Sequence, residues 1–400
     1  MGIIAERIER LSESATLKMA TRSREMQAEG IDVINLSIGE PDFNTPGCVK
    51  EAAFQAIRDN HTHYTPVPGI PALRKAIAEK LKRENGLDYS PDQIVVSNGA
   101  KQSIVNAILA VVNPGDEVIV PAPYWVSYPD MISLAGGTMI TVETSIEQEF
   151  KMLPEQLAAA ITPRTKLLMI NSPNNPSGAV YSMKELEALA RVLAEHPNVY
   201  ILSDEIYEYI NFAGKHASFA SFPELRDRVI LINGVSKGYA MTGWRIGYLA
   251  AVREIAAACN KLQGQTTSGA SSISQYAALA AISSVDCSSE EVATMVEAFR
   301  ARRQLVIDKL KAIPGVIPND AHGAFYVFPN IAAFFGKSYN GKVIRNAGDL
   351  CLYLLENAHV ATVDGTAFGN DRCIRISYAT GMELLETAMD RIAGALSELR

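Results

Sequence analysis

The sequence predicts an α/β protein: a mostly parallel, seven-stranded sheet with helices on both faces, joined to a smaller α+β domain. Between residues 45 and 290, short runs rich in β-branched residues alternate with longer helical stretches, which is typical of a parallel sheet. Beyond residue 290, strand candidates are grouped with flanking helices. The 400 residues also exceed one ordinary compact core. We therefore expect a large domain over 45–290 and a small domain formed by 1–44 together with 291–400.

The strand candidates of the large domain are mostly short and apolar throughout, as expected where helices cover both faces of a sheet. They are residues 94–97, 117–120, 138–142, 166–170, 199–203, 229–232 and 246–250. Helix candidates between them are residues 102–112, 154–160 and 184–195. The last of these follows Ser182, a good N-cap, and has Glu185 in the capping-box position. Such βα alternation implies right-handed crossovers.

The two ends of the chain together supply the elements of the small domain. A long helix is predicted over 289–312, before Pro314 and Gly315. The strand and helix candidates that follow are 323–328, 347–357, 359–363, 373–378 and 382–399. In the N-terminal arm a helix is predicted over 16–29, ended by Gly30. We expect this arm to pack against the C-terminal domain or a partner subunit.

Composition and charge argue against several classes of protein. The net charge is −7 with both signs interleaved, so no extended positive field for nucleic acid or an anionic membrane is expected. No apolar run is long enough to span a bilayer, and the N-terminus lacks a secretory signal pattern. The cysteines are scattered singly, which predicts no disulfide framework, no metal site and a reducing, cytoplasmic location. They are Cys48, Cys259, Cys287, Cys351 and Cys373.

The segment 233–247 combines an amine, two anion-binding side chains and small residues. Lys237 lies between Ser236 and Gly238, and Arg245 follows eight positions later. The glycine allows a planar group to approach the backbone closely, because it has no side chain. Ser236 and Arg245 can donate hydrogen bonds to phosphate oxygens. An amine nucleophile beside an anion site is what pyridoxal phosphate requires, since its aldehyde forms a Schiff base with lysine.

Polar residues also follow three other strand candidates, at the edge where open α/β sheets bind ligands. Lys101 lies in a segment of small residues that opens a helix, whose first amides favour phosphate. Asn175 can present its amide from a loop rich in proline and asparagine. Asp204 can keep a pyridine nitrogen protonated, and Tyr207 can reach the phenolic oxygen of the same ring.

Each of these residues also has a purely structural interpretation. Lys101 fits a solvated helix start, Asn175 a turn, and Asp204 a helix N-cap with Tyr207 in the core. Their joint occurrence after successive strands of one sheet favours a single cofactor site.

The segment from Gly234 to Gly247, Gly-Val-Ser-Lys-Gly-Tyr-Ala-Met-Thr-Gly-Trp-Arg-Ile-Gly, matches the pyridoxal-phosphate attachment signature of class I aminotransferases. The resemblance extends over essentially the whole chain and is greatest to bacterial aspartate aminotransferases. Further matching segments are residues 37–42, 64–69, 123–128, 174–178, 203–207 and 375–377. The resemblance implies pyridoxal 5′-phosphate as cofactor, fold type I, and a homodimer with active sites at the subunit interface. It also implies small-molecule amino acid and 2-oxo acid substrates.

The resemblance also implies roles for individual residues. Lys237 would form the Schiff base and carry the proton from the substrate Cα to C4′ of the cofactor, in a ping-pong cycle. Asp204 would pair with the ring nitrogen, and Asn175 and Tyr207 would hold the phenolic oxygen. The other cofactor contacts would come from Trp125 on the ring face and, at the phosphate, from the amides of Ala100 and Lys101, from Ser236 and Arg245, and from Tyr64 of the neighbouring subunit.

The substrate α-carboxylate would be bound by Gly39 and, bidentately, by Arg375, with Trp125 and Asn175 also at the substrate. In the run 374–377 the two isoleucines share one side of a strand, so Arg375 points to the other. An arginine at such a position is more often a surface residue, and the resemblance favours the binding role.

The side chain that binds a second carboxylate is less sharply defined. Some aspartate aminotransferases use an arginine of the other subunit, but this chain has no arginine between Arg253 and Arg300. The subgroup it resembles carries a lysine at the position of Lys101, with Ser14 and Thr16 of the N-terminal arm as closing residues. Because a lysine is a flexible point charge, aromatic or prephenate transamination is the alternative to aspartate transamination.

Other classes fit the sequence less well. A pyridoxal-phosphate lyase would keep the same cofactor residues. A transcription regulator built on this fold would need an N-terminal DNA-binding domain, and about one helix precedes Gly39 here. A hydrolase dyad of Ser236 and Lys237 would leave Asp204 and Arg245 without a role.

Overall fold

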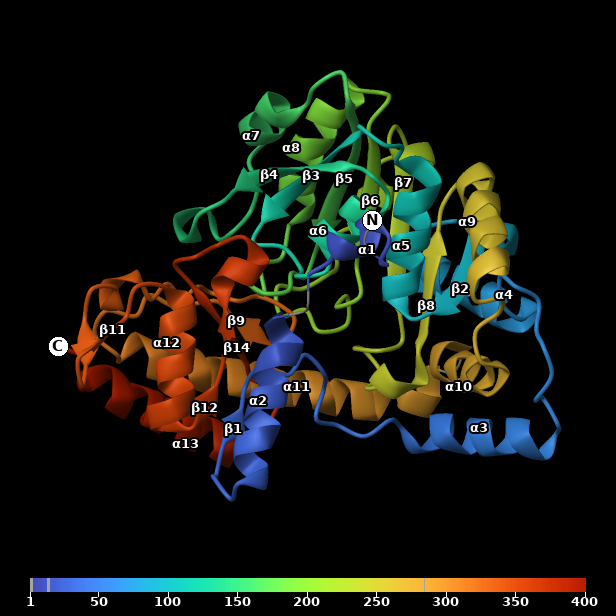
Figure 1. Cartoon of the computed structure of the whole chain (residues 1–400). Coiled ribbons are helices and arrows are strands. Elements are labelled where there is room, and N and C mark those ends of the chain that lie inside the picture. Colours follow the sequence, from blue (N-terminus) through green and yellow to red (C-terminus); the bar gives the residue numbers. More distant parts are fainter. Residues whose placement is uncertain (1–2, 13–14, 284) are drawn as a thin grey trace.

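The central sheet of the molecule has seven strands in the order β2-β8-β7-β6-β5-β3-β4 (Figure 1). The structure is a computed structural model that describes residues 3–12, 15–283 and 285–400, apart from the side chains of 15–18, 20 and 285–288. The strands are β2 (Ile94–Asn98), β3 (Glu117–Ala122), β4 (Thr138–Glu143), β5 (Thr165–Asn171), β6 (Tyr200–Asp204), β7 (Val229–Gly234) and β8 (Ile246–Ala250). Each predicted strand of the large domain is confirmed, with ends that differ by up to two residues.

The direction of the strands places their polar C-terminal residues at one edge. Only β8 runs antiparallel to its neighbours β2 and β7, and the other pairs of this sheet are parallel. Asn98, Asn171 and Asp204 end β2, β5 and β6, while β7 ends at Gly234, shortly before Lys237. These residues therefore lie at the edge where open α/β sheets bind ligands.

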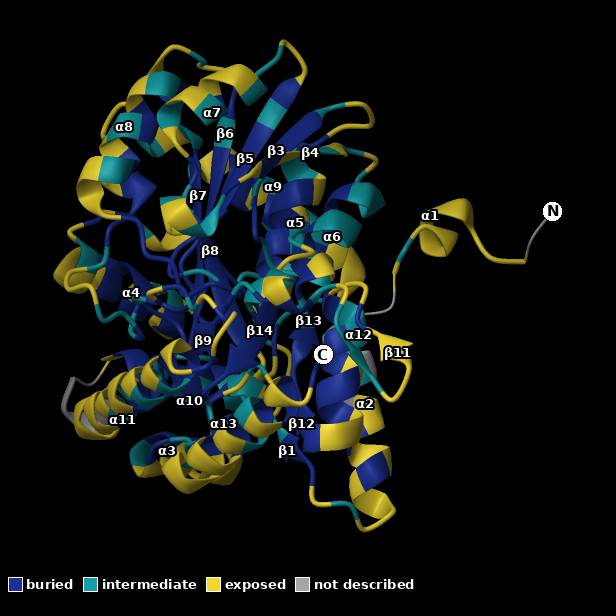
Figure 2. Ribbon diagram, turned by 90° about the vertical axis from the view of Figure 1, so that its left-hand side faces the viewer, coloured by how far each residue is buried: buried dark blue, intermediate teal, exposed yellow. Residues whose placement is uncertain are grey.

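Helices cover both faces of the sheet (Figure 2). Alternate strand residues belong to the apolar core on each face. Ile94 and Val96 of β2 belong to one apolar core and Val95 to the other. The first core is closed by α3 (Gly47–Arg58), α4 (Pro71–Lys80), α7 (Pro154–Ala160), α8 (Met183–Ala194) and α10 (Ser272–Ser283). The second is closed by α5 (Ala100–Val111), α6 (Tyr128–Leu134) and α9 (Arg253–Thr266).

The start of α8 follows the predicted capping box. The Ser182 side chain accepts a hydrogen bond from the Glu185 amide at 3.3 Å, and the Glu185 carboxylate accepts one from the Ser182 amide at 2.7 Å. Each side chain thus satisfies a backbone donor that the helix leaves free. The predicted helix 154–160 is α7 with the same ends.

The C-terminal part of the chain forms a separate, third apolar core. The long helix α11 (Val285–Lys311) crosses beneath the sheet and leads into this C-terminal core (Figure 1). The elements that follow are β9 (Tyr326–Val327), β10 (Ser338–Tyr339), β11 (Lys342–Val343), α12 (Ala347–Tyr353), β12 (Val360–Ala361), β13 (Val363–Asp364), β14 (Ile374–Ser377) and α13 (Met382–Ser397). Strands β13, β14 and β9 form an antiparallel sheet, and β10 pairs with β11.

Four predicted elements of the C-terminal part differ from those in the structure. The single strand predicted over 359–363 is two strands, because β12 pairs with the N-terminal arm and β13 with β14. Thr362 between them donates its hydroxyl to Cys351 Sγ at 3.2 Å. The helix predicted over 347–357 ends as a π-helical turn, Leu354–Ala358. The strands in 323–328 and 373–378 are shorter than predicted.

The N-terminal arm packs against the C-terminal part, as predicted. Strand β1 (Ile34–Asn35) pairs in parallel with β12. Met26 of α2 (Ala15–Ala28) packs with Val33, Leu355 and Ala361 in a small apolar cluster. A short helix, α1 (Glu6–Glu9), precedes α2. The domain boundaries at 45 and 290 stay a prediction.

The cysteines depart in one respect from expectation. Cys259, Cys351 and Cys373 are free and buried, whereas Cys48 at the start of α3 is disulfide-bonded. One disulfide is not a framework, but it departs from the reducing compartment that the scattered cysteines predicted. Among the described residues, no helix is both long enough and apolar enough to cross a membrane.

Candidate active site

A cavity of about 350 Å³ lies at the carboxyl edge of the central sheet. The side chains that surround it come from β5, β6, the loop after β7, the start of α5, and β14. The predicted site residues that line it are Gly39, Ala100, Lys101, Trp125, Asn175, Asp204, Tyr207, Ser236, Lys237, Arg245 and Arg375. Residues spread over most of the chain are thus brought into one chamber.

Lys237 lies beside a pair of aromatic rings at this cavity. Its ammonium is 5.8 Å from the ring centres of Tyr207 and of Phe325. Its Nζ donates a hydrogen bond to the carbonyl oxygen of Gly39 at 2.5 Å. Burial lowers the pKa of Lys237 to about 8, with Arg375 and Arg245 acting in the same direction and Glu40 and Asp204 opposing. A buried amine with a lowered pKa is suited to nucleophilic attack on a carbonyl carbon.

This lowered pKa predicts how the cofactor-free protein reacts with pyridoxal phosphate. Only the neutral amine attacks an aldehyde, so the attachment rate at Lys237 is expected to rise with pH around a midpoint near 8. Stopped-flow absorbance over pH 6–10 measures it, with Nα-acetyl-lysine as the control for an ordinary amine. A midpoint above about 10, the value of an exposed lysine, contradicts the prediction.

Asp204 ends β6 with its carboxylate buried at the cavity wall. Its Oδ2 accepts a hydrogen bond from Tyr128 Oη at 2.7 Å, and its Oδ1 accepts one from the Ile206 amide at 3.3 Å. Burial raises the pKa of Asp204 to about 6 despite these two donors. The two hydrogen bonds therefore do not offset the cost of burying the negative charge, and a cation beside the carboxylate would stabilise its ionised form.

The start of α5 leaves backbone amides free for an anion. The N-cap is Gly99, which has φ +81° and no side-chain cap, so the first amides of the helix lack an intrahelical partner. Arg245 reaches this helix start, and a Cβ on Gly99 would lie 2.2 Å from its Nη2. A Cβ on Gly247 would lie 2.1 Å from the Ala100 nitrogen. Glycines at 99 and 247 thus allow backbone, guanidinium and helix dipole to converge on one point, as phosphate binding requires.

Arg375 on β14 is buried, and its Nε has no hydrogen-bond partner among the described residues. Its Nη1 donates to Asn175 Oδ1 at 3.0 Å and its Nη2 to the Ser37 carbonyl oxygen at 2.6 Å. The guanidinium lies 4.6 Å from the ring centre of Tyr326. A buried arginine with a free donor needs an acceptor, and a carboxylate supplies one.

Gly39 faces Arg375 from a segment that the long helix holds in place. Arg302 of α11 pairs bidentately with Asp42, through Nη1–Oδ1 at 2.7 Å and Nη2–Oδ2 at 2.9 Å. Phe43 lies under the same guanidinium, 5.0 Å from it. A side chain at position 39 would collide with Tyr326 Oη, which lies 2.9 Å from an ideal Cβ. Glycine is therefore required where the loop closes the cavity.

Lys101 and Trp125 form the outer wall of the cavity. The Lys101 ammonium lies 4.8 Å from the Trp125 ring centre, which is a cation–π contact. Desolvation and the nearby Arg245 lower the pKa of Lys101. Trp125 is also edge-on to Tyr128, with ring centres 5.5 Å apart. The exposed Lys101 side chain is thus aimed along the rim, where its charge can meet an incoming anion.

Three further residues join the site that the sequence reasoning gave no role. Tyr128 donates to Asp204, and Asn171 donates from Nδ2 to the Asp204 carbonyl oxygen at 2.9 Å. Tyr326 Oη lies 2.9 Å from Tyr207 Oη. Tyr128 lies in the matching segment 123–128 and Asn171 just before the segment 174–178, so their positions in the sequence could have indicated a role in the site. Tyr326 lies in the small domain, and no pattern in the sequence links it to Tyr207.

Two predicted residues are not brought to this cavity within one chain. The Tyr64 side chain is 99% exposed and does not line the cavity. Thr16 belongs to α2, but its side chain is outside the described residues, as is the whole of Ser14. Their predicted contacts stay predictions.

The cavity fits pyridoxal phosphate on the chemistry of its donors and acceptors. It offers a buried amine at Lys237, an under-compensated carboxylate at Asp204 and an uncapped helix start beside Arg245. These meet the aldehyde, the ring nitrogen and the phosphate of the cofactor respectively. Fold and cavity together define a pyridoxal-phosphate-dependent enzyme of fold type I.

Comparison with known proteins gives the family. The profile of aminotransferase class I and II matches residues 31–392. An aspartate/prephenate aminotransferase of Cereibacter sphaeroides is 49% identical over 395 residues, which are 98% of each chain. The chain belongs to the aminotransferase class I and II family, whose cofactor is pyridoxal phosphate. Its substrates are small molecules.

Solved structures agree with this assignment. The aspartate aminotransferase of Rhizobium meliloti superposes with a TM-score of 0.96 at 45% identity, covering all of both chains. That of Thermus thermophilus with maleate gives 0.93 at 42% identity, covering 99% of this chain and 100% of the other.

Proposed function

We propose that this protein catalyses transamination between L-aspartate and 2-oxoglutarate, giving oxaloacetate and L-glutamate. One observation carries the choice of substrate: two cationic side chains, Lys101 and Arg375, line the cavity that holds Lys237. A dicarboxylic amino acid can meet one with each carboxylate while its α-amino group faces the lysine. The names of the relatives support the same choice, and so does the maleate, a dicarboxylate, of the Thermus thermophilus structure.

Each residue of the cavity then has a chemical task. When bound, pyridoxal phosphate supplies an aldehyde that joins to an amine and a ring that accepts the electrons released at the substrate Cα. Asp204 holds the proton on the ring nitrogen, because its buried carboxylate gains a cationic partner there. Asn175 and Tyr207 orient the ring at its phenolic oxygen, and Trp125 covers one ring face.

The phosphate end is held by the start of α5. The amides of Ala100 and Lys101 donate to its oxygens, together with the hydroxyl of Ser236 and the planar fork of Arg245. These donors would hold the cofactor independently of its bond to Lys237.

Lys237 moves the proton on which the reaction depends. With pyridoxal phosphate bound, the neutral Nζ of Lys237 would accept the proton from the substrate Cα and would carry a proton to C4′ of the cofactor. The lowered pKa leaves a useful fraction of the amine neutral near pH 8. Arg375 and Gly39 hold the α-carboxylate meanwhile, so that the Cα–H bond stays directed at Nζ. The second substrate, a 2-oxo acid, reverses these steps, which gives ping-pong kinetics.

Prephenate or aromatic transamination is the second candidate. It is favoured by the aspartate/prephenate name of the Cereibacter sphaeroides relative, and by the apolar wall that Trp125 and Ile104 give the cavity. The Lys101 ammonium, lying over Trp125, can move aside for a ring because a lysine is a flexible point charge.

A half-reaction screen separates these candidates. Each amino acid is mixed with the yellow holoenzyme, and the loss of visible absorbance of the bound cofactor is followed without any 2-oxo acid. Fast loss with aspartate and glutamate and slow loss with phenylalanine and alanine support the proposal. The opposite order contradicts it. Pyruvate or ammonia formed without an added 2-oxo acid identifies a lyase instead.

Lys101→Ser is expected to weaken selection for dicarboxylates. The variant keeps the backbone amide at the phosphate but loses the ammonium, so kcat/KM for aspartate falls by about 10–10²-fold, as for one lost charged hydrogen bond. The kcat/KM for alanine changes by less than about 3-fold. Lys166→Ser is the matched control, since Lys166 also lies over an aromatic ring, Tyr200 at 4.9 Å, outside the cavity. Equal losses of kcat/KM for aspartate and alanine would show that Lys101 does not bind the second carboxylate.

We also propose a homodimer in which Tyr64 of each subunit completes the partner's phosphate site. The almost fully exposed Tyr64 supports it, as do the exposed apolar side chains Phe54 and Ile57 of α3, 55% and 47% exposed. Such side chains on an outer helix are typical of an interface.

Mixed dimers test the arrangement. Tyr64→Ala and Lys237→Ala each damage every site of their own homodimer. A heterodimer of the two has one site with both residues intact, so refolding the mixture is expected to restore activity above that of either variant. Sedimentation velocity gives the mass of the wild type, with twice the chain mass expected. A monomer, or a mixture without regained activity, contradicts the shared site.

A cytoplasmic location completes the proposal. It rests on the free, buried thiols of Cys259, Cys351 and Cys373, which are typical of reducing compartments. Fractionation of the source cells tests it, with activity in the cytoplasmic fraction expected.

A further inference from the structure

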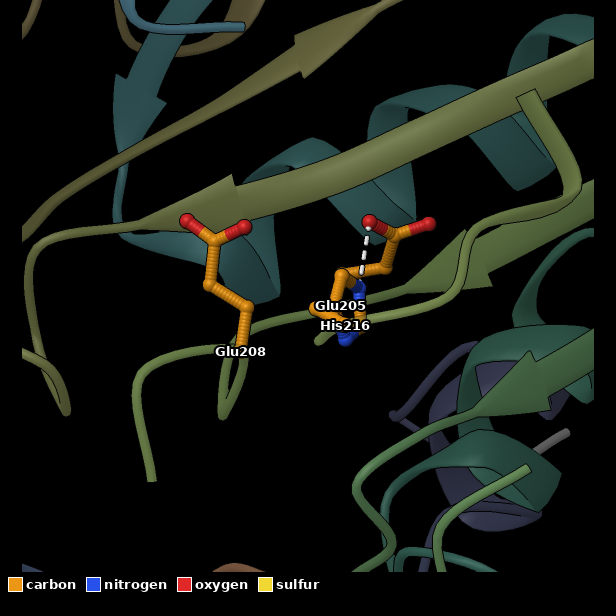
Figure 3. A group of neighbouring side chains, drawn as sticks. All are labelled: Glu205, Glu208 and His216. Atoms are coloured by element: carbon orange, nitrogen blue, oxygen red, sulfur yellow. Dashed lines mark hydrogen bonds and ion pairs between the residues drawn. The ribbon is translucent and has the colours of Figure 1, made fainter. Parts of the chain in front are cut away.

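A cluster of ionisable side chains lies behind the turn that carries Asp204 and Tyr207. It comprises Glu205, Glu208 and His216, whose potential ligand atoms lie within 4.8 Å of one another (Figure 3). The two glutamates alternate along the chain with the two cavity residues. Both glutamates are buried, so their charges require partners.

Glu205 has a full set of partners. Its Oε1 accepts hydrogen bonds from Ser203 Oγ at 2.8 Å and from Ser218 Oγ at 2.5 Å. Its Oε2 lies 2.9 Å from His216 Nε2. The backbone amide of Glu205 donates to the Ile232 carbonyl oxygen at 2.9 Å. Ser203 and Glu205, the residues directly before and after Asp204, are thereby fixed in place.

Glu208 is paired with a lysine from another helix. Lys80, the last residue of α4, places its Nζ against Glu208 Oε1, and its side chain is 2% exposed. Asn85 Nδ2 donates to Glu208 Oε2 at 3.0 Å. The cluster resembles a metal site in composition, but the Lys80 ammonium already supplies the cation. We therefore interpret it as an ion-pair network.

The charges in this network balance. Burial by itself lowers the pKa of His216, but Glu205 and Glu208 outweigh it and the opposing Lys80, so the pKa is raised. Burial raises the pKa of Glu208, but Lys80 and His216 outweigh it, so that pKa is lowered. Glu84 Oε2 also lies 3.7 Å from Lys80 Nζ, and its Oε1 pairs with Arg83 Nη2 at 2.5 Å. The carboxylates of Glu84, Glu205 and Glu208 are thus matched by Arg83, Lys80 and the His216 imidazolium, which gives the zero net charge that burial favours.

The network also reaches the loop that carries Lys237. The Lys80 ammonium lies 5.2 Å from the ring centre of Tyr209. That ring fills the space beside Gly238, where a Cβ would lie 2.4 Å from it, and Tyr239 Oη donates to Tyr209 Oη at 2.9 Å. Changes in the network can therefore act on both the Asp204 turn and the lysine loop.

We propose that Glu205 and His216 are positioning residues for Asp204: they fix the backbone around it, and their paired charges set the electrostatic potential at its carboxylate. The inference rests on the proposed role of Asp204 at the ring nitrogen of the cofactor. Glu205 is the nearest of these charges in sequence, and it raises the pKa of Asp204. Removing one charge of the pair should shift that potential, and removing both should restore it.

The test measures the pH midpoint of the visible absorbance change of the bound cofactor in the holoenzyme. His216→Gln leaves Glu205 without its cation, so the electrostatic potential around Asp204 and the bound cofactor becomes more negative. Protonation of the cofactor is then favoured, and the midpoint rises by about 1 pH unit, the order expected of one nearby buried charge. Glu208→Gln leaves Lys80 uncompensated, so the midpoint falls. The double variant Glu205→Gln/His216→Gln removes both charges and returns the midpoint to within about 0.3 unit of wild type.

Two controls separate charge from structure. Ser218→Ala removes a hydrogen bond to Glu205 and no charge, and Lys215→Gln removes an exposed charge from the same loop. Both are expected to leave the midpoint unchanged. If His216→Gln does not fold, the opposite shift of Glu208→Gln carries the test.

A purely structural network gives different results. The midpoint of the double variant would then shift at least as far as that of His216→Gln, or the midpoint of Ser218→Ala would shift as far as that of His216→Gln or Glu208→Gln. Either result would show the inference to be wrong. Identical midpoints in all variants would also overturn it. Failure of the proposed function is distinguished beforehand, because the wild-type holoenzyme would then not lose absorbance with aspartate or any other amino acid.

Discussion

Replacing Lys237 with alanine is expected to reduce turnover by at least about 10²–10⁴-fold, the contribution of one positioned general base. The expected loss is larger still, because the same amine also forms the covalent bond to the cofactor. No other described lysine or arginine except Lys101, Arg245 and Arg375 lines the cavity. Of these, a guanidinium does not act as a base in proteins, and Lys101 is at the rim over Trp125.

The variant should retain much of its affinity for pyridoxal phosphate. The start of α5, Arg245 and Asp204 are untouched, and in the proposed function they hold the phosphate and the ring rather than the aldehyde. On the same sample, equilibrium dialysis should therefore show cofactor affinity close to that of the wild type, while steady-state transamination should be strongly reduced. Lys215→Ala is the control, since that lysine is exposed and outside the cavity. Near-normal transamination by Lys237→Ala would remove the basis for the assigned mechanism.

The sheet was predictable from the sequence because its strands carry a strong local signal. Runs such as 229–232 are apolar at every position, and in the structure both faces of β7 are buried. Helix α10 carries no comparable signal: it packs between α3, α4 and the sheet, so its apolar residues do not follow a helical period. The small strands β12 and β13 depend on partners far away in sequence, and a local pattern cannot specify them.

The same distinction applies to the site. Lys237, Asn175 and Asp204 lie in short segments whose residue types alone suggest a ligand. Tyr326 enters through β9, and its hydroxyl contacts Tyr207 across more than a hundred residues of sequence. His216 pairs with Glu205 from a loop without any motif. Such contacts arise from tertiary packing, and the contact proposed for Tyr64 would further require a second subunit.

Arg375→Ala is expected to lower kcat/KM for aspartate by about 10²–10³-fold, equivalent to roughly 3–4 kcal/mol, as for the loss of one partner from a buried charged pair. The cause is twofold. The substrate carboxylate loses a bidentate donor, and the Asn175 side chain and the Ser37 carbonyl oxygen lose the donors that now satisfy them.

Arg375→Lys shows whether charge or geometry matters more. A lysine keeps the positive charge but not the planar fork, and it cannot span Asn175 Oδ1 and the Ser37 carbonyl oxygen while also facing a carboxylate. We therefore expect Arg375→Lys to recover only a small part of the loss, about 10-fold or less. The matched control is Arg372→Lys, an exposed arginine near the start of the same strand, with kcat/KM within about 2-fold of wild type.

The affinity for the cofactor separates a substrate role from a general disturbance of the site. Because Arg375 faces the substrate side of the cavity, the dissociation constant of pyridoxal phosphate should stay within about 3-fold in both variants, while KM for aspartate rises. A dicarboxylate inhibitor such as maleate should weaken in parallel with aspartate, since it binds the same guanidinium without reacting. If cofactor affinity fell as far as kcat/KM, Arg375 would be holding the Asn175 loop rather than the substrate, and the carboxylate would need a different partner.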